Sequence, residues 1–131
     1  MRPGVRFHIG GRVGETPLAI GPGKVALLEA IQETGSITSA AKTLGMSYRR
    51  AWMLVDETNR CLVKPAVTTA AGGEHGGGTE LTATGAELVA RYRTLERKTA
   101  GAVDKAFGPL LATISARRKS TASPTLRRAR R

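Results

Sequence analysis

The alternation of apolar and polar residues predicts a β-hairpin at the start of the chain. In the stretch VRFHI, the apolar side chains of Val5, Phe7 and Ile9 alternate with polar ones, as in a half-buried strand. The glycine pair that follows should end this strand, and residues 17–20 offer a return strand. We therefore expect residues 1–22 to form an N-terminal β-hairpin.

The apolar spacing then changes to a helical period. Val25, Leu28 and Ile31 recur at steps of three, a proline stands where the first turn would begin, and Gly35 suits a C-terminal cap. This pattern predicts a helix over residues 23–34.

The next stretch, GSITSAAKTLGMSYRRAWMLVDETNR, predicts two helices joined by a tight turn. Ser36 and Ser47 can each cap a helix N-terminus, and Gly45 can adopt the left-handed conformation that a tight turn requires. The small Ala41 allows the two helices to approach closely, and the second helix should run to about Arg60. This order is typical of a helix-turn-helix.

The second of these helices has two different sides when it is plotted at about 100° per residue. The expected apolar side holds Ala51, Trp52, Val55 and Leu62, with Tyr48 at its edge. The expected exposed side holds Arg49, Met53, Asp56 and Arg60, with Arg50 beside it. Arginine can bind guanine through O6 and N7 or hold a phosphate, so this side resembles a DNA-recognition surface. A solvated helix face with ordinary charges is the alternative, and the capped turn in front favours recognition.

The glycine-rich stretch AGGEHGGG predicts the tip of a second hairpin, because the β-prone segments AVTTA and TELT flank it. A hairpin after a helix-turn-helix is a wing, and its tip would bring His75, Gly76 and Gly77 to DNA. A phosphate-binding nucleotide loop would need lysine followed by serine or threonine after its last glycine, and here threonine and glutamate follow. A linker between domains is the other alternative. The winged helix-turn-helix would then span residues 23–83.

The segment after the wing predicts a long helix over residues 84–108. Thr84 and Glu87 have the spacing of a capping box, and a glycine–proline pair should stop the helix. Its apolar residues follow alternating steps of four and three: Leu88, Tyr92, Leu95, Thr99, Ala102 and Ala106. This heptad-like seam predicts a dimer interface through Leu88, Tyr92, Leu95 and Ala102. The alternative is that the helix folds back on its own domain.

Composition and charge point to a polyanionic partner. The chain has 131 residues, enough for about one domain, and aromatics make up only 4%, so aliphatic residues must build the core. The net charge is +11, and seven of the positive charges lie in residues 117–131, a segment without acidic residues. We expect residues 109–131 to form a disordered basic tail that binds a polyanion, or else serves only solubility.

Other classes of protein are poorly supported. No apolar run approaches the roughly 18 residues of a membrane span, and no signal peptide is visible. Cys61 is the only cysteine, and His8 and His75 lie in different segments, so we expect neither a metal site nor a cofactor. No catalytic constellation is present, and we expect a cytoplasmic protein that is not an enzyme.

Three motifs, GSITSAAKTLGMSYRRAW, GGEHGGG and LTATGAEL, resemble the N-terminal DNA-binding domain of ModE-type molybdate-responsive transcriptional regulators. This domain is related in fold to the LysR-type winged helix, and the resemblance spans residues 27–92, about half of the chain. It implies an α+β, mainly α fold: a winged helix-turn-helix that binds promoter DNA as a homodimer through a long C-terminal helix. The residues expected to bind DNA are Ser36, Ser47, Tyr48, Arg49, Arg50, Met53, His75, Gly76 and Gly77. The resemblance assigns Trp52 to the core.

The chain departs from that family in two places. Wings of the family usually carry a basic residue among the glycines, whereas this one carries Glu74. No length remains after the long helix for the paired oxyanion-binding domains, so molybdate binding is not expected in this chain. The sequence therefore predicts a transcription regulator that binds double-stranded DNA. The alternative is a sequence-tolerant nucleoid-type protein in which the basic tail and the wing dominate.

Overall fold

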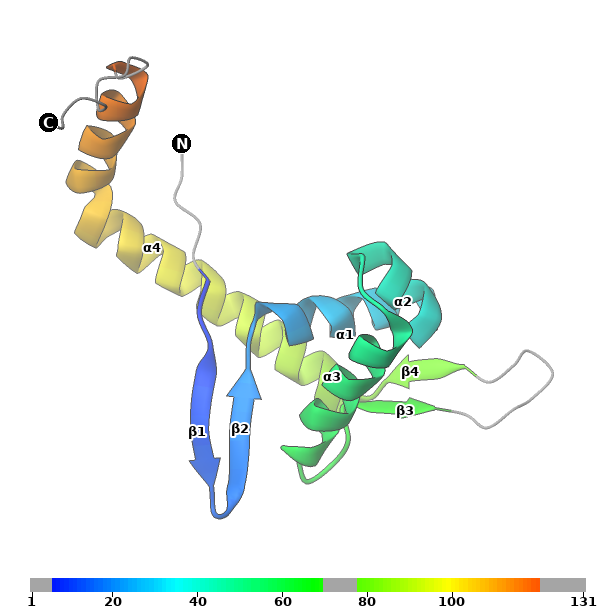
Figure 1. Cartoon of the computed structure of the whole chain (residues 1–131). Helices are drawn as coiled ribbons and strands as arrows, with labels where there is room; N and C mark the ends of the chain where they lie inside the picture. The colour runs from blue at the N-terminus through cyan, green and yellow to red at the C-terminus, as the bar shows by residue number, and fades with distance from the viewer. Residues whose placement is uncertain (1–5, 70–77, 121–131) are drawn as a thin grey trace, which may run out of the picture. The chain divides into compact units, whose positions relative to one another are not determined.

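A computed structural model describes residues 6–69 and 78–120 of the chain. Within these residues it contains two antiparallel hairpins and four helices, mainly helical in content (Figure 1). The elements are β1 (Ile9–Val13), β2 (Thr16–Ile20), α1 (Pro22–Thr34), α2 (Ile37–Leu44), α3 (Tyr48–Arg60), β3 (Val67–Thr69), β4 (Thr79–Leu81) and α4 (Ala83–Ser120). The predicted α+β, mainly α class with a winged helix-turn-helix is confirmed.

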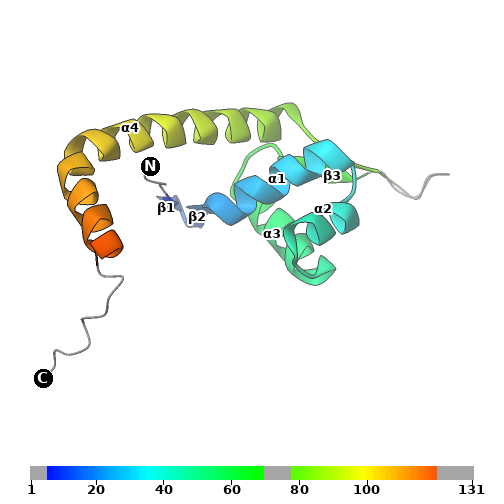
Figure 2. The same ribbon diagram turned by 90° about the horizontal axis from the view of Figure 1, so that it is seen from above.

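The core lies around α1, which packs against α2, α3 and β4. Leu27, Leu28 and Ile31 of this helix are almost completely buried, and small alanines of α2 and α3 allow the three helices to come close. Aliphatic side chains therefore build most of the core, as the low aromatic content predicted. Figures 1 and 2 show the three helices grouped together, with the β3–β4 hairpin leading away from them.

The N-terminal hairpin is present, but its first strand begins later than predicted. β1 starts at Ile9 and pairs with β2 in the register Ile9↔Ile20, so the glycine pair lies inside the strand and does not end it. Phe7, which the apolar alternation assigned to the strand, precedes β1. Its ring packs against Tyr92 instead, so it contributes to the core without being part of a strand. The turn between the strands contains Gly14 at a φ of 66°, a conformation that glycine adopts easily.

α4 differs from the predicted helix at both ends. It begins at Ala83, and its cap is Thr82, whose Oγ1 accepts a hydrogen bond from the Gly85 N–H at 3.0 Å. It also passes through Pro109 and ends at Ser120, beyond the predicted stop. A proline inside a helix removes one backbone hydrogen bond, because it has no N–H to donate. The Pro109 carbonyl still accepts a hydrogen bond, here from the side-chain hydroxyl of Thr113 at 3.1 Å.

The first turns of α4 belong to the helical core. Tyr92 is 2% exposed, its hydroxyl donates to the Phe7 carbonyl at 2.8 Å, and the two rings stack with centroids 4.6 Å apart. Arg93 donates to both carboxylate oxygens of Glu29 on α1, at 2.9 and 2.6 Å. Residues 6–95 therefore form one compact unit, and the rest of α4, from Glu96, belongs to a second.

Candidate nucleic-acid interface

The turn between α2 and α3 has the geometry that the sequence predicted. Ser36 caps α2 by accepting the Ser39 N–H at 3.1 Å, and Ser47 caps α3 by accepting the Arg50 N–H at 3.1 Å. Gly45 has a φ of 69°, in the left-handed region. The following Met46 N–H donates to the Ala41 carbonyl at 3.0 Å, which closes the turn. The start of α3 is thereby held at a defined place beside α2.

The exposed side of α3 is basic in its first turn. Ala51, Val55 and Thr58 face the core, while Arg49 and Arg50 are exposed to solvent. Among the residues that the structure describes, no carboxylate lies within ion-pair distance of either guanidinium. Both charges are therefore available to a ligand.

The later turns of α3 carry balanced charges. Arg60 pairs with Asp56 at 3.0 Å, and Glu57 pairs with Lys24 of α1 at 3.2 Å. A shallow depression in the surface, next to the start of the helix, is lined by Ser47, Arg49, Arg50, Met53, Leu54 and Glu57. The positive charge of α3 is thus concentrated where a recognition helix would meet DNA.

Trp52 does not lie in the core, so its predicted assignment is wrong. Its side chain is 49% exposed, and Tyr48, one turn earlier, is also exposed. The physical reason is the narrow contact of α3, in which only the row formed by Ala51, Val55 and Thr58 is fully buried. Trp52 follows Ala51 by one residue and is rotated about 100° away from that row.

The wing is attached to α3 by Asn59, a residue that the sequence analysis missed. Its Oδ1 accepts the N–H groups of Ala66 at 2.8 Å and Val67 at 3.2 Å, and its Nδ2 donates to the Val67 carbonyl at 3.1 Å. Asn59 thus satisfies the backbone of β3 on the side turned away from β4. A polar residue on the flank of a helix, eight residues before the start of a strand, is only a weak signal in a sequence.

The other side of the wing is fixed by contacts at its base. β3 and β4 pair in the register Val67↔Leu81, Thr68↔Glu80 and Thr69↔Thr79. The Thr79 N–H donates to the Gly35 carbonyl at 3.0 Å, and Thr82 Oγ1 donates to the Pro65 carbonyl at 2.7 Å. The predicted wing hairpin is confirmed in its strands. His75, Gly76 and Gly77 lie outside the described residues.

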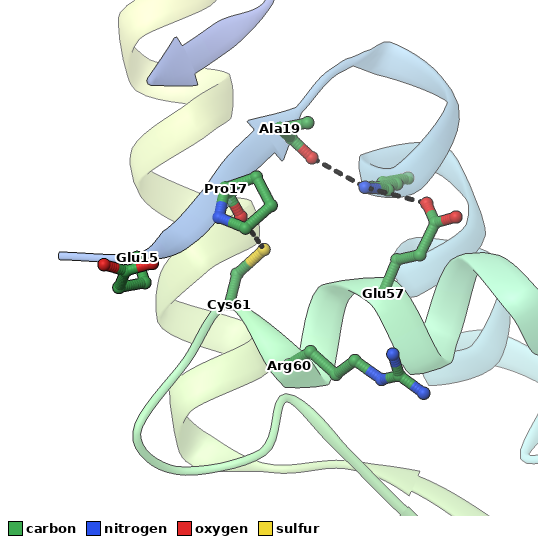
Figure 3. A pocket seen from close by; sticks show the side chains of 7 residues that line it. Glu15, Pro17, Ala19, Glu57, Arg60 and Cys61 are labelled. Atoms are coloured by element: carbon green, nitrogen blue, oxygen red, sulfur yellow. Dashed lines mark hydrogen bonds and ion pairs between the residues drawn. The ribbon is translucent and has the colours of Figure 1, made fainter. Parts of the chain in front are cut away.

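A second depression lies between β2 and the end of α3 (Figure 3). Lys24 crosses it, donating from Nζ to the Ala19 carbonyl at 2.7 Å and pairing with Glu57, and Cys61 Sγ lies 3.2 Å from the Pro17 carbonyl oxygen. These contacts join the N-terminal hairpin to the helices. Within residues 6–69 and 78–120, no three His, Cys, Asp or Glu side chains gather closely enough to hold a metal ion.

The residues expected at a dimer interface lie in different environments. Leu88 is partly buried against the core, and Tyr92 is buried within its own chain. Neither therefore exposes much surface in the single chain, and their place in a dimer interface stays a prediction. Leu95 is 43% exposed and Ala102 is exposed. Phe107 and Leu110, which the predicted seam left out, are about half exposed. Dimerisation itself stays a prediction.

A capped tight turn, an exposed basic helix behind it and a β-hairpin after that helix together define the winged helix-turn-helix class. More specifically, the chain is homologous to the N-terminal part of the ModE regulators and the Mop proteins. No family model matches the chain. None of the helices, so far as the structure describes them, is both long and apolar enough to cross a membrane.

Three relatives show the extent of this homology. The molybdenum transport protein ModE of Azotobacter vinelandii is 44% identical over 87 residues, which cover 66% of this chain and 32% of the relative. The molybdenum-pterin-binding protein MopB of Rhodobacter capsulatus is 47% identical over 81 residues, 62% of this chain and 30% of that one. The DNA-binding transcriptional dual regulator ModE of Escherichia coli K12 is 39% identical over 74 residues, which cover 56% of this chain and 28% of the relative. The chain spans about a third of the length of these relatives.

Proposed function

We propose that this chain is a DNA-binding transcription regulator that places α3 in the major groove of double-stranded DNA. One observation carries the proposal: two exposed arginines, which have no carboxylate partner among the described residues, stand in the first turn of a helix held by the Gly45 turn and the Ser47 cap. The N-terminal residues of a recognition helix are those that contact base edges. The relative from Escherichia coli is named as a DNA-binding regulator, which supports the same reading.

The roles of the α3 residues follow from their chemistry. The guanidinium of Arg49 can donate two hydrogen bonds to guanine O6 and N7, and Arg50 can do the same or hold a phosphate. Ser36, Ser47 and Tyr48 each carry a hydroxyl that can donate to phosphate, even where its oxygen already accepts a backbone N–H. The positive end of the helix dipole adds to this attraction for phosphate.

The wing adds a second contact. Its strands are held against α1 and α3 by Gly35 and Asn59, so the segment between them, with His75, Gly76 and Gly77, would reach the neighbouring groove or backbone. Backbone N–H groups of glycine can approach phosphate closely because no side chain intervenes. Glu74 opposes this contact, because a carboxylate is repelled by phosphate.

We further propose that the chain acts as a homodimer in the cytoplasm. The large apolar side chains exposed on the described part of α4 are Leu95, Phe107 and Leu110, and the predicted interface residue Ala102 is exposed as well. Two copies related by a two-fold axis would bind two half-sites, as dimeric helix-turn-helix proteins do. Molybdate binding by this chain is not part of the proposal, because the homology covers only about a third of each relative.

A second candidate function is sequence-tolerant binding of nucleic acid, which the distribution of charge along the chain supports. Residues 117–131 carry seven of the positive charges, while the remaining 116 residues have fourteen basic against ten acidic side chains. Such a tail attracts any nucleic acid. The two candidates differ in whether α3 discriminates between sequences or whether the tail supplies most of the affinity for any sequence.

Selection of bound duplexes from random DNA, followed by affinity measurements, separates the two candidates. We expect a preferred sequence, and Arg49→Ala should weaken its binding about 5- to 150-fold while relaxing preference at one base pair. Arg12→Ala, which removes an exposed arginine on β1, is the matched control and should leave the preference unchanged. Equal losses on selected and random DNA for Arg49→Ala would refute specific recognition by α3.

A further inference from the structure

Two large apolar side chains stand on the exposed part of α3 without any role in the core. Trp52 is 49% exposed and Met53 is 47% exposed. Their neighbour Leu54 is partly buried against the core, whereas about half of the surface of each of these two side chains is open to solvent. Tryptophan is on average among the more buried residue types, so an exposed one calls for an explanation.

The position of Met53 relates it to Arg49. The two residues are four apart on one helix, so their side chains are neighbours on its surface, on the side opposite the buried row of Ala51, Val55 and Thr58. Their Cα atoms are separated by about 6 Å along the helix axis. That distance is roughly one to two base-pair steps of a duplex lying along the helix.

Trp52 lies on the flank of α3 that faces the wing. It precedes Asn59 by seven residues, almost two full turns, so both lie along one row of the helix. Asn59 reaches the backbone of β3 from that row. Trp52 therefore stands between the Arg49 row and the base of the wing.

The charges around these two side chains favour DNA as the occupant. Arg49 and Arg50 beside them lack a carboxylate partner among the described residues, which suits a polyanion. An apolar protein partner would have to cover both guanidinium groups and leave them unsatisfied, at considerable cost. In the major groove the one apolar group that distinguishes a base is the C5-methyl of thymine.

We infer that Met53 and Trp52 read thymine, packing against C5-methyl groups next to the base pair that Arg49 contacts. This inference rests on the proposed binding of α3 in the major groove and adds apolar contacts to the hydrogen bonds of Arg49. The preferred site then has thymines within one to two steps of the Arg49 base pair and on the side toward the wing. Specificity arises from methyl burial as well as from hydrogen bonds.

Replacing thymine by deoxyuridine tests the inference, because it removes only the methyl group. Each thymine of the selected duplex is replaced in turn, and the affinities of the full chain for the two duplexes are compared. Burying one methyl group is worth about fourfold in affinity, so we expect about that loss at one or more positions. In Met53→Ala, the loss should disappear at the thymine that Met53 contacts. In Trp52→Ala, it should disappear at the thymine that Trp52 contacts.

Two control variants separate this inference from the proposed function. Val63→Ala removes a fully exposed aliphatic side chain after α3 and should keep the full deoxyuridine effect. Arg49→Ala should weaken both duplexes equally and keep the ratio between them. Trp52 is also the only tryptophan of the chain, so its fluorescence should shift to shorter wavelength and resist acrylamide when the duplex binds.

The outcomes are distinct. Deoxyuridine effects that persist in both variants, or that are absent in the wild type while the selected duplex still binds, would overturn thymine reading and leave DNA binding intact. Unchanged affinity of both variants for every duplex would assign the two side chains to another partner and would also refute the inference. A chain that binds no duplex selectively would overturn the proposed function and this inference together.

Discussion

Replacing Asn59 by alanine should loosen the wing without changing any residue that would touch DNA. The substitution removes the acceptor of the Ala66 and Val67 N–H groups and the donor to the Val67 carbonyl. Ala66 is 0% and Val67 is 3% exposed, so water cannot easily replace the lost partners. A buried donor left unsatisfied costs about 1–3 kcal/mol. Asn59 itself is only partly buried, so we expect a total loss of about 2–4 kcal/mol.

Urea denaturation of the wild type and the variant measures this loss, and hydrogen exchange locates it. The Ala66 and Val67 amides should exchange faster in Asn59→Ala, while amides in the centre of α1 change only with global stability. Asn59→Asp keeps both acceptor bonds and places a carboxylate against the Val67 carbonyl, so its loss should be smaller than that of alanine. Thr68→Ala, on the exposed side of β3, is the control and should change stability by less than about 0.5 kcal/mol.

Two results would contradict the role assigned to Asn59. Stability of Asn59→Ala within about 0.5 kcal/mol of the wild type would mean that water satisfies the β3 backbone. A loss for Asn59→Asp as large as that for alanine would mean that the two accepted bonds contribute little. If Asn59→Ala loses more stability than Asn59→Asp, as expected, both variants should also weaken binding to the selected duplex, because the wing would be held less firmly.

Four further predictions concern charge and assembly. The hydrogen bonds from Arg93 lower the pKa of Glu29, so the pair stabilises the fold above pH 4.5 and loses this effect as the pH falls below 4.5. Because the pair is partly exposed, Glu29→Gln should lower the free energy of unfolding by only about 0.5–1 kcal/mol at pH 7. A difference in stability between variant and wild type that persists in acid would contradict this. Phe107→Asp should give folded monomers in sedimentation, and a monomeric wild type at micromolar concentration would refute the dimer. Deleting residues 117–131 should weaken binding to all duplexes alike and flatten its salt dependence; a loss confined to the selected duplex would argue against a nonspecific tail. Glu74→Lys should tighten binding by about one phosphate contact's worth of salt slope, and an unchanged slope would place the wing tip away from DNA.

The sequence predicted those parts of the fold that depend on local chemistry. Serine caps, a left-handed glycine and helical apolar spacing act within a few residues, so Ser36, Gly45 and Ser47 were identified correctly. The two strands of the wing followed from β-prone segments on either side of the glycines. These signals need no knowledge of what packs against the element.

The errors arose where a distant element decides the outcome. Trp52 was assigned to the core from the family resemblance and its place on the apolar side of the helix, but the width of the buried row depends on how closely α1 and α2 approach α3. The stacking of Tyr92 on Phe7, 85 residues earlier, could not be predicted either, because the heptad-like spacing of Tyr92 says nothing about the N-terminal segment. The bonds of Asn59 to β3 likewise appear only when the wing folds back on the helix.

Within residues 6–69 and 78–120, the contacts that hold the wing are made by its strands and by residues before and after them. Asn59 and Gly35 bind the strands from the helices, and Thr82 closes the hairpin at its base, so the register is set before the chain reaches the glycine-rich stretch. Insertions, deletions and charge changes between Thr69 and Thr79 can therefore accumulate without disturbing the helices. For evolution and for protein engineering alike, this stretch can therefore be exchanged: homologous or designed sequences can be grafted onto the two strands while the helical scaffold stays the same, which would alter the affinity for DNA if the proposed function holds.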